Sequence, residues 1–158
     1  MNGIRQVVTF YVDGISFAAD VDLIEYIIRA VKIDTIPGAP QLLLGVINYH
    51  GVFVPVINFR HRLRLKEREV SSKDFIIIAK MNDMRIAFAA DEITGYREID
   101  PSTIKNVHEL WKGISRLESI TRQNDEFIVI TDLGHFLNAD ESLSLSALLS
   151  QLHAQTGG

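Results

Sequence analysis

The amino-acid sequence predicts an all-β fold, a barrel or a sandwich built from many short strands. Short apolar runs rich in Val, Ile and Phe recur along the chain up to about residue 131. Polar or glycine-containing turn pairs separate successive runs, and the tetrapeptide Phe-Ala-Ala-Asp occurs twice, at 17–20 and 88–91. Many short strands at regular spacing are typical of small barrels and sandwiches.

Four β-hairpins are predicted in chain order. VVTFYV and ISFAAD flank Asp13-Gly14, a pair that favours a type I′ turn. GVINYHGVFVPVINF, at 45–59, breaks once, at a turn over 48–51. FIIIAKM and MRIAFAAD flank Asn82-Asp83, while ISRLESI and EFIVIT flank a polar segment around Asn124-Asp125.

The repeated tetrapeptide indicates two similar β units in one domain. Each copy closes a hairpin and precedes an amphipathic run, VDLIEYII at 21–28 and EITGYREI at 92–99. We expect the first run to begin as a helix capped by Asp20 or Asp22. Its apolar residues exceed what one helix turn needs for its own core, so we expect it to lie near the cleft between the two units.

The C-terminal segment changes from strand to helix. Asp132 is placed to cap a short helix LGHFLN, and Asp140 to cap a longer one, ESLSLSALLSQLH. The longer helix has one apolar face, formed by Leu145, Leu148, Leu149 and Leu152. We expect this face to pack on the domain or on a second copy of the chain.

Composition excludes several classes of function. The chain of 158 residues has room for one domain. A net charge of −4 argues against nucleic acid as a partner, and the absence of cysteine excludes disulfides and thiol catalysis. No secretory signal or membrane-spanning run is present, so we expect a cytoplasmic protein without direct membrane insertion.

The sequence carries no recognisable catalytic or cofactor motif. No nucleophile elbow, phosphate loop or dinucleotide fingerprint is present, and the five histidines are scattered. We therefore expect no catalytic residue, no metal, no cofactor and no enzymatic activity. The basic run from Arg60 to Arg68 is expected to be a solvated loop or a rim that contacts an acidic protein. Trp111 and Phe127 are expected in the core.

The turn at 48–51 carries the strongest candidate contact. Asn48 can bond the backbone of its own turn, and Gly51 can adopt positive φ. Tyr49 and His50 are then free choices as far as the turn is concerned. Side chains displayed at an exposed tip without a structural reason are candidate contacts for a partner.

These residues together resemble the CheW family, the small adaptors of bacterial chemosensory arrays. The resemblance spans about residues 5–137 and is most specific between 36 and 63. Matching positions there are Ile36, Pro37, Ala39, Pro40, Gly45, Val46, Ile47, Asn48, Gly51, Pro55, Val56, Arg60 and Leu63. It implies two small five-stranded SH3-like β-barrels that share an apolar core. Residues 5–138 would form this CheW-like domain of two subdomains, and 139–158 a C-terminal helix and frayed tail.

The resemblance also implies a function. CheW-like proteins are non-catalytic scaffolds that couple the cytoplasmic tips of methyl-accepting chemotaxis receptors to the regulatory domain of the histidine kinase CheA, within membrane receptor arrays. The implied protein-binding residues are Ile24, Tyr26, Ile27, Asn48, Tyr49, His50, Gly51 and Arg60. His50 stands where the family usually has Arg, and Tyr26 where it often has Glu. The alternative is an SH3-like or OB-like barrel that binds peptide or nucleic acid outside chemosensory signalling.

Overall fold

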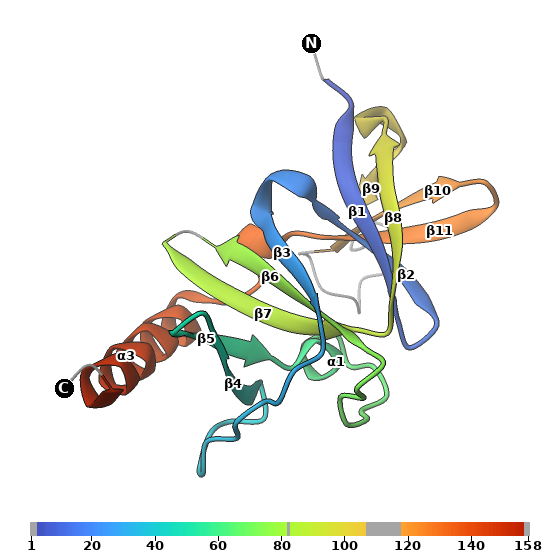
Figure 1. Cartoon of the computed structure of the whole chain (residues 1–158). Helices are drawn as coiled ribbons and strands as arrows, with labels where there is room; N and C mark the ends of the chain where they lie inside the picture. The colour runs from blue at the N-terminus through green and yellow to red at the C-terminus, as the bar shows by residue number, and fades with distance from the viewer. Residues whose placement is uncertain (1–2, 82, 107–117, 157–158) are drawn as a thin grey trace.

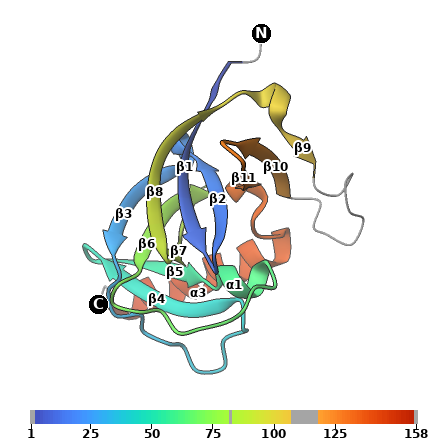
Figure 2. The same cartoon turned by 90° about the vertical axis from the view of Figure 1, so that its right-hand side faces the viewer.

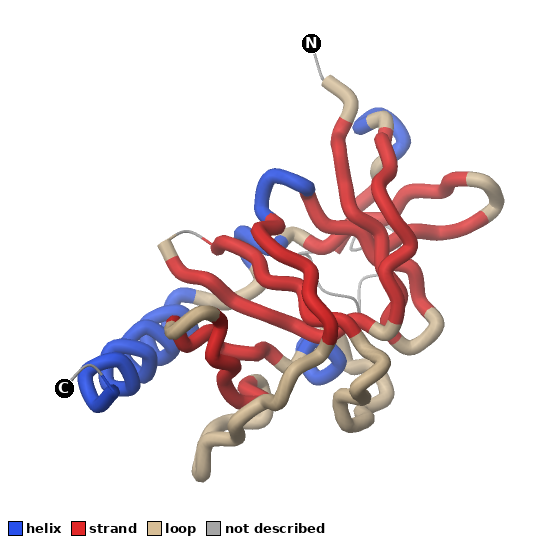
Figure 3. Tube along the Cα trace, viewed as in Figure 1, coloured by secondary structure: helices blue, strands red, loops and turns tan. Residues whose placement is uncertain are grey.

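A computed structural model describes residues 3–81, 83–106 and 118–156 of the chain. Strands dominate these residues, and one long helix lies at the C-terminal end (Figure 3). The strands form two sheets, one of six strands and one of five. The all-β prediction is therefore confirmed, whereas the expected five strands in each unit hold for one sheet only.

The six-stranded sheet, sheet A, has the strand order β8-β1-β2-β11-β10-β9. Figure 2 shows β8, β1 and β2 side by side. Neighbouring strands are antiparallel except for β2 and β11, which run parallel with Ser16 opposite Ile128. The strands are β1 (Arg5–Val12), β2 (Ile15–Asp20), β8 (Glu92–Ile99), β9 (Lys105–Asn106), β10 (Glu118–Gln123) and β11 (Glu126–Thr131).

The five-stranded sheet, sheet B, has the order β3-β6-β7-β5-β4. Its strands are β3 (Ile24–Arg29), β4 (Leu43–Tyr49), β5 (Val52–Ile57), β6 (Phe75–Met81) and β7 (Met84–Ala90). The chain that leaves β3 returns to the opposite edge, where Asp34 and Val46 exchange two backbone hydrogen bonds of 2.8 and 2.9 Å. Gly45 permits this contact, because a Cβ atom there would lie 2.2 Å from the Asp34 carbonyl oxygen.

The predicted hairpins are all present. β1 and β2 join through Asp13 and Gly14, which both have positive φ as a type I′ turn requires. Met81 pairs with Met84 in the β6–β7 hairpin, although Asn82 of the predicted turn lies outside the described residues. β10 and β11 join through Asn124 and Asp125. The first part of the predicted strand ISRLESI, residues 114–117, lies outside the described residues.

An aromatic core joins the two sheets, as the shared-core expectation requires. Phe10 of sheet A contacts Phe88 of sheet B with 5.5 Å between ring centroids. The two copies of the repeated tetrapeptide contribute equivalent phenylalanines, and both contact Phe59, Phe17 at 5.1 Å and Phe88 at 5.0 Å. The sequence repeat therefore places two matching side chains around one central ring.

The amphipathic run at 21–28 is where the sequence expectation is wrong. Only η1 (Val21–Leu23) is helical, as a single 3₁₀ turn, and the rest is strand β3. The carboxylate of Asp20 makes no capping bond to η1 and instead pairs with Arg5 at 2.7 Å. The second run, at 92–99, is strand β8. Both runs are rich in β-branched and aromatic residues, which favour strands.

Four helical segments complete the described chain: α1 (Phe59–Arg62), η2 (Pro101–Thr103), η3 (Leu133–His135) and α3 (Ala139–Thr156). Asp132 caps η3 as predicted, accepting from the Gly134 amide, but the helical part is one 3₁₀ turn and not the predicted 133–138. For α3 the cap is Asn138 and not Asp140, because Asn138 and Glu141 exchange side chain-to-backbone hydrogen bonds. The helix packs beside β5 (Figure 1), and Leu145 of the predicted apolar face is buried in the shared core.

Candidate protein-binding surface

The structure brings together two predicted site residues that are far apart in sequence. Tyr26 lies on β3 and Tyr49 on β4, the two edge strands of sheet B. Their ring centroids are 5.0 Å apart, and the Tyr49 ring also lies 4.3 Å from the imidazole of His50. We call these three residues, Tyr26, Tyr49 and His50, the aromatic patch.

The aromatic patch is open to solvent. Tyr26 is 43% exposed, His50 is exposed and Tyr49 is half-buried against the sheet B core. Exposed aromatic side chains with a polar tip are enriched at protein interfaces, since they supply apolar area and a hydrogen-bonding group together. The arrangement offers a binding surface.

An ion pair borders the aromatic patch. The Arg85 guanidinium on β7 donates to the Glu25 carboxylate at 2.9 Å, and its carbon lies 5.9 Å from the Tyr26 ring centroid. The hydrogen bond to Glu25 raises the pKa of Arg85 above its ordinary value. No local sequence pattern indicates this pair, because its members are far apart in the chain and only the β3–β6–β7 order brings them together.

Two other predicted residues, Ile24 and Ile27, face the opposite side of β3. Tyr26 pairs with Ile78, which belongs to the sheet B core, whereas Ile27 pairs with Ile77, which belongs to the shared core. Directly paired residues point to the same face of a sheet. Ile24 is half-buried against the shared core, and Ile27 is exposed. Strand β3 therefore presents Tyr26 on one face and Ile24 and Ile27 on the other, because its pairing with β6 shifts register between Ile24 and Tyr26.

The turn beside the aromatic patch differs from its prediction. Asn48 does bond the turn, accepting from the Gly51 amide at 2.8 Å. However, Tyr49 and Val52 form the last strand pair, so the loop consists of His50 and Gly51, with φ of 53° and 85°. His50 is therefore not a free choice, because it occupies a left-handed conformation that most residues adopt at a cost.

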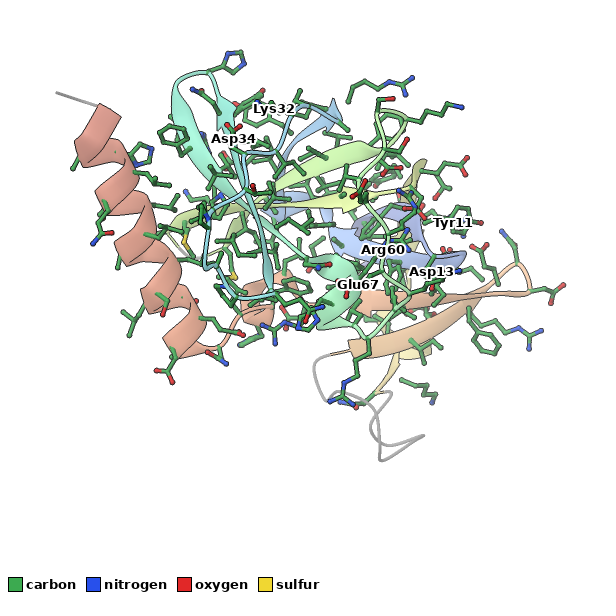
Figure 4. The ribbon with its side chains drawn as sticks, turned by 90° about the horizontal axis from the view of Figure 1, so that it is seen from below. Tyr11, Asp13, Lys32, Asp34, Arg60 and Glu67 are labelled. Carbon is green, nitrogen blue, oxygen red and sulfur yellow. The ribbon has the colours of Figure 1, made fainter. Side chains whose placement is uncertain are left out.

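Arg60 binds within the chain. Its side chain is only 11% exposed, and one amine contacts both carboxylate oxygens of Asp91 at 2.7 Å. A second amine donates to the carbonyl of Lys66 at 2.8 Å and lies 3.8 Å from Asp13. Figure 4 shows Arg60 beside Asp13, on the side of the molecule away from α3. This geometry assigns Arg60 to holding the two sheets together and removes it from the displayed surface.

Two more cations of the basic run and one predicted core residue also differ from expectation. Arg62 pairs with Glu141 of α3 at 2.5 Å, and Arg68 pairs with Asp74 and Asp91. Arg62 and Arg68 therefore make contacts within the chain.

Phe127 is exposed on the β10–β11 hairpin and is not a core residue. Trp111 lies outside the described residues.

The described residues contain neither a metal-binding cluster nor a membrane-spanning helix. No group of three or more His, Cys, Asp or Glu side chains among them is placed to hold a metal ion. None of the helices in the described ranges is long and apolar enough to span a bilayer.

Comparison with known proteins gives a consistent set of similarities. The family model of the CheW-like domain matches residues 6–141. The chain is 29% identical over 145 residues to "Chemotaxis protein CheW" of Bacillus subtilis, covering 89% of this chain and 91% of that protein. It is 27% identical over 132 residues to the protein of the same name from Thermotoga maritima, covering 84% and 87%. Its fold is similar to that of the scaffolding protein TtCheW from Thermoanaerobacter tengcongensis, with a TM-score of 0.78, 24% identity and coverage of 90% and 95%.

Proposed function

Since the chain belongs to the CheW-like domain family, we propose that it is a non-catalytic chemotaxis scaffold that couples receptors to a kinase. The proposed partners are the regulatory domain of the histidine kinase CheA and the cytoplasmic tip of methyl-accepting chemotaxis receptors. No cofactor takes part. The proposed location is the cytoplasm, in association with membrane receptor arrays.

The observation that carries this proposal is the double-sided strand β3. A scaffold that joins two partners needs two surfaces that remain available at the same time. β3 turns Tyr26 to the aromatic patch and Ile27 to the face that sheet B directs toward sheet A. We assign the aromatic patch to the kinase and the face that carries Ile24 and Ile27 to the helical receptor tip, which would dock as a helix in a groove.

Nucleic-acid binding is less well supported than the scaffold role. A nucleic-acid surface needs cations that are free to contact phosphates. In the basic run, Arg60, Arg62 and Arg68 are each paired with a carboxylate of the same chain. The net charge of −4 also argues against binding of a polyanion such as nucleic acid.

Isothermal titration of two variants tests the assignment, each with a control of equal chemistry. Tyr26→Ala should weaken binding of the CheA regulatory domain about tenfold or more, because truncating an aromatic hot-spot residue costs about 2 kcal/mol or more. Tyr96→Ala removes another tyrosine, 53% exposed on β8, and should leave that affinity unchanged. Ile27→Asp should weaken binding of the receptor tip, whereas Ile15→Asp, at a site of the same 37% exposure on sheet A, should not.

Several outcomes would count against the proposal. Absence of binding to both partners at millimolar concentration would exclude the scaffold role. Equal effects of Tyr26→Ala and Tyr96→Ala on the kinase would exclude the aromatic patch as the contact. A gel shift with DNA or RNA at physiological salt would favour the nucleic-acid alternative. A fluorescent fusion should co-localise with receptors, and should become diffuse in cells that lack them.

A further inference from the structure

A histidine near the end of α3 accepts a hydrogen bond from the backbone of a strand. The amide N–H of Phe53 on β5 donates to Nε2 of His153 at 3.1 Å. The two rings also lie against each other, with centroids 5.5 Å apart. The contact joins residues that are 100 positions apart in the chain.

The strand donor is available because of the hairpin geometry. Tyr49 and Val52 flank the two-residue loop and form a hydrogen-bonded pair, so the next pair, Asn48 and Phe53, is not hydrogen-bonded. The Phe53 amide therefore points away from β4. On its other side, the described pairing of β5 with β7 is at Val56, further along the strand. The imidazole of His153 takes the place of a neighbouring strand.

The direction of this hydrogen bond fixes the protonation state of the imidazole. A backbone amide can only donate, so Nε2 must carry its lone pair and the ring must be neutral with its proton on Nδ1. Protonation would place a hydrogen on Nε2, opposite the amide hydrogen. Histidine side chains ordinarily change charge between about pH 5 and 8. The contact needs the neutral ring, so it is compatible with the upper end of that range and not with the lower end.

The charged groups around His153 are balanced. Glu25 of β3 and Arg85 of β7 line the same groove and are paired with each other. Lys80 of β6 and Asp83 of the β6–β7 turn also line it, one of each sign. The described lining of the groove therefore includes two cations and two anions, so its charges balance.

The rest of α3 is held in a different way. Leu145 is buried in the shared core and Leu148 packs against it, so the first half of the helix is fixed by apolar contacts. The second half covers a groove of about 440 Å³ between the β4–β5 hairpin and the β6–β7 turn, with Leu149, Ser150 and His153 on the helix side.

We propose that His153 is a pH-sensitive latch, which holds the second half of α3 on β5 while neutral and releases it when protonated. Release would uncover the Phe53 amide and the groove, next to the hairpin that carries Tyr49 and His50. Protonation would not by itself unwind the helix, because a cation near a helix C-terminus stabilises the helix dipole. Protonation would therefore change whether the second half of α3 stays on β5, and not how much of α3 is helical.

Amide exchange of Phe53, followed by NMR at pH 5.5 and pH 7.5, tests the latch. His153→Gln supplies an acceptor oxygen that does not titrate, and His153→Ala supplies none. Comparing variants at the same pH cancels the intrinsic pH dependence of exchange. At pH 7.5 wild type and His153→Gln should exchange alike, while His153→Ala should exchange two- to about tenfold faster, as expected for one lost hydrogen bond.

At pH 5.5 wild type should exchange two- to about tenfold faster than His153→Gln and approach His153→Ala. Ser150→Ala, in the same groove, should keep the wild-type pH dependence. A wild-type to His153→Gln ratio that is the same at both pH values would overturn the proposal. So would Phe53 protection in His153→Ala equal to that of wild type at pH 7.5.

Discussion

At the scale of single residues, His50 combines a display position with a backbone requirement. Its φ of 53° is left-handed, a region that Asn and Gly tolerate and β-branched residues avoid. We expect His50→Val to lower the free energy of unfolding by about 1 kcal/mol or more, and His50→Asn to stay within about 0.5 kcal/mol of wild type. Urea denaturation measures both. Equal stabilities would show that the loop relaxes to another turn type.

The ion pair between Arg60 and Asp91 should matter for stability. Asp91 closes the second repeat of Phe-Ala-Ala-Asp, and Arg60 links it to Asp13 in the β1–β2 turn of sheet A. Arg60→Ala leaves a partly buried carboxylate with fewer partners, which should cost about 1–3 kcal/mol. The matched control is Arg122→Ala, which breaks an exposed pair with Asp125 and should cost less than about 1 kcal/mol. A comparable loss in both variants would contradict the linking role.

Asp74 should make the free energy of unfolding depend on pH in the acid range. Burial alone would raise the pKa of Asp74, but hydrogen bonds from Arg68 and from the Ser71 amide outweigh it and lower the pKa. A carboxylate with a depressed folded-state pKa stabilises the protein above its unfolded pKa, about 3.9, and this stability is lost as the pH falls through the folded value. Asp74→Asn should therefore show a shallower loss of stability below about pH 4 than wild type does. Equal slopes for wild type and Asp74→Asn in an acid titration followed by circular dichroism would contradict this role.

The residues Arg60 and His50 show what sequence reasoning misses at this scale. A basic run looks solvated as long as the positions of its partners are unknown. Asp91 lies 31 positions from Arg60, and nothing local indicates that β7 ends beside it. For His50, the sequence shows the turn but not which two of its four residues form the loop, and that choice decides which residue has positive φ.

At the scale of elements, β3 and α3 differ in how far the sequence predicts them. Ile-Glu-Tyr-Ile-Ile fits both an amphipathic helix and a strand over so short a run, and its β-branched content favours the strand it adopts. α3 is long enough for its leucine spacing to identify the buried face. Its cap, Asn138, lies two residues before the predicted Asp140, because Asn and Asp are both common capping residues and the sequence pattern does not choose between them.

The apolar face of α3 gives a prediction for this element. Leu145 is 8% exposed in the shared core, whereas Leu143, on the same helix, is 70% exposed. Leu145→Ala should reduce the free energy of unfolding by about 2–5 kcal/mol, the usual range for a buried leucine. Leu143→Ala should change it by no more than about 0.5 kcal/mol. Thermal unfolding of both variants tests whether the helix is part of the cooperative fold, and equal stabilities would place it outside.

At the scale of the whole molecule, local pairing is predictable and sheet assembly is not. Each hairpin follows from turn residues and apolar runs that adjoin in sequence. The order of strands depends on contacts between distant segments, such as the parallel pair of β2 and β11 and the bridge from Asp34, after β3, to Val46 of β4. The contact between Tyr26 and Tyr49 arises from this long-range order, so the site could be predicted as two separate pieces but not as one surface.

The proposed kinase contact should have modest affinity with little dependence on salt. The ion pair that borders the aromatic patch, Glu25 and Arg85, carries no net charge, so charge attraction should contribute little. We expect a Kd near micromolar, about −8 kcal/mol, and a buried area below about 1,200 Å². Titration at low and at high salt should give values within about threefold of each other. A strong salt dependence would indicate a charged contact surface elsewhere.

The division of the chain between the two sheets has a consequence during synthesis. Sheet B uses one continuous stretch, 24–90, whereas sheet A joins 5–20 to 92–131. On the ribosome, β1 and β2 emerge first, yet the outer edge of β2 has no neighbour until β11 has been translated. Sheet B can fold within that interval, because its strands are already complete. The N-terminal hairpin must wait with an open edge, which makes the nascent chain most prone to aggregation before its last strand appears.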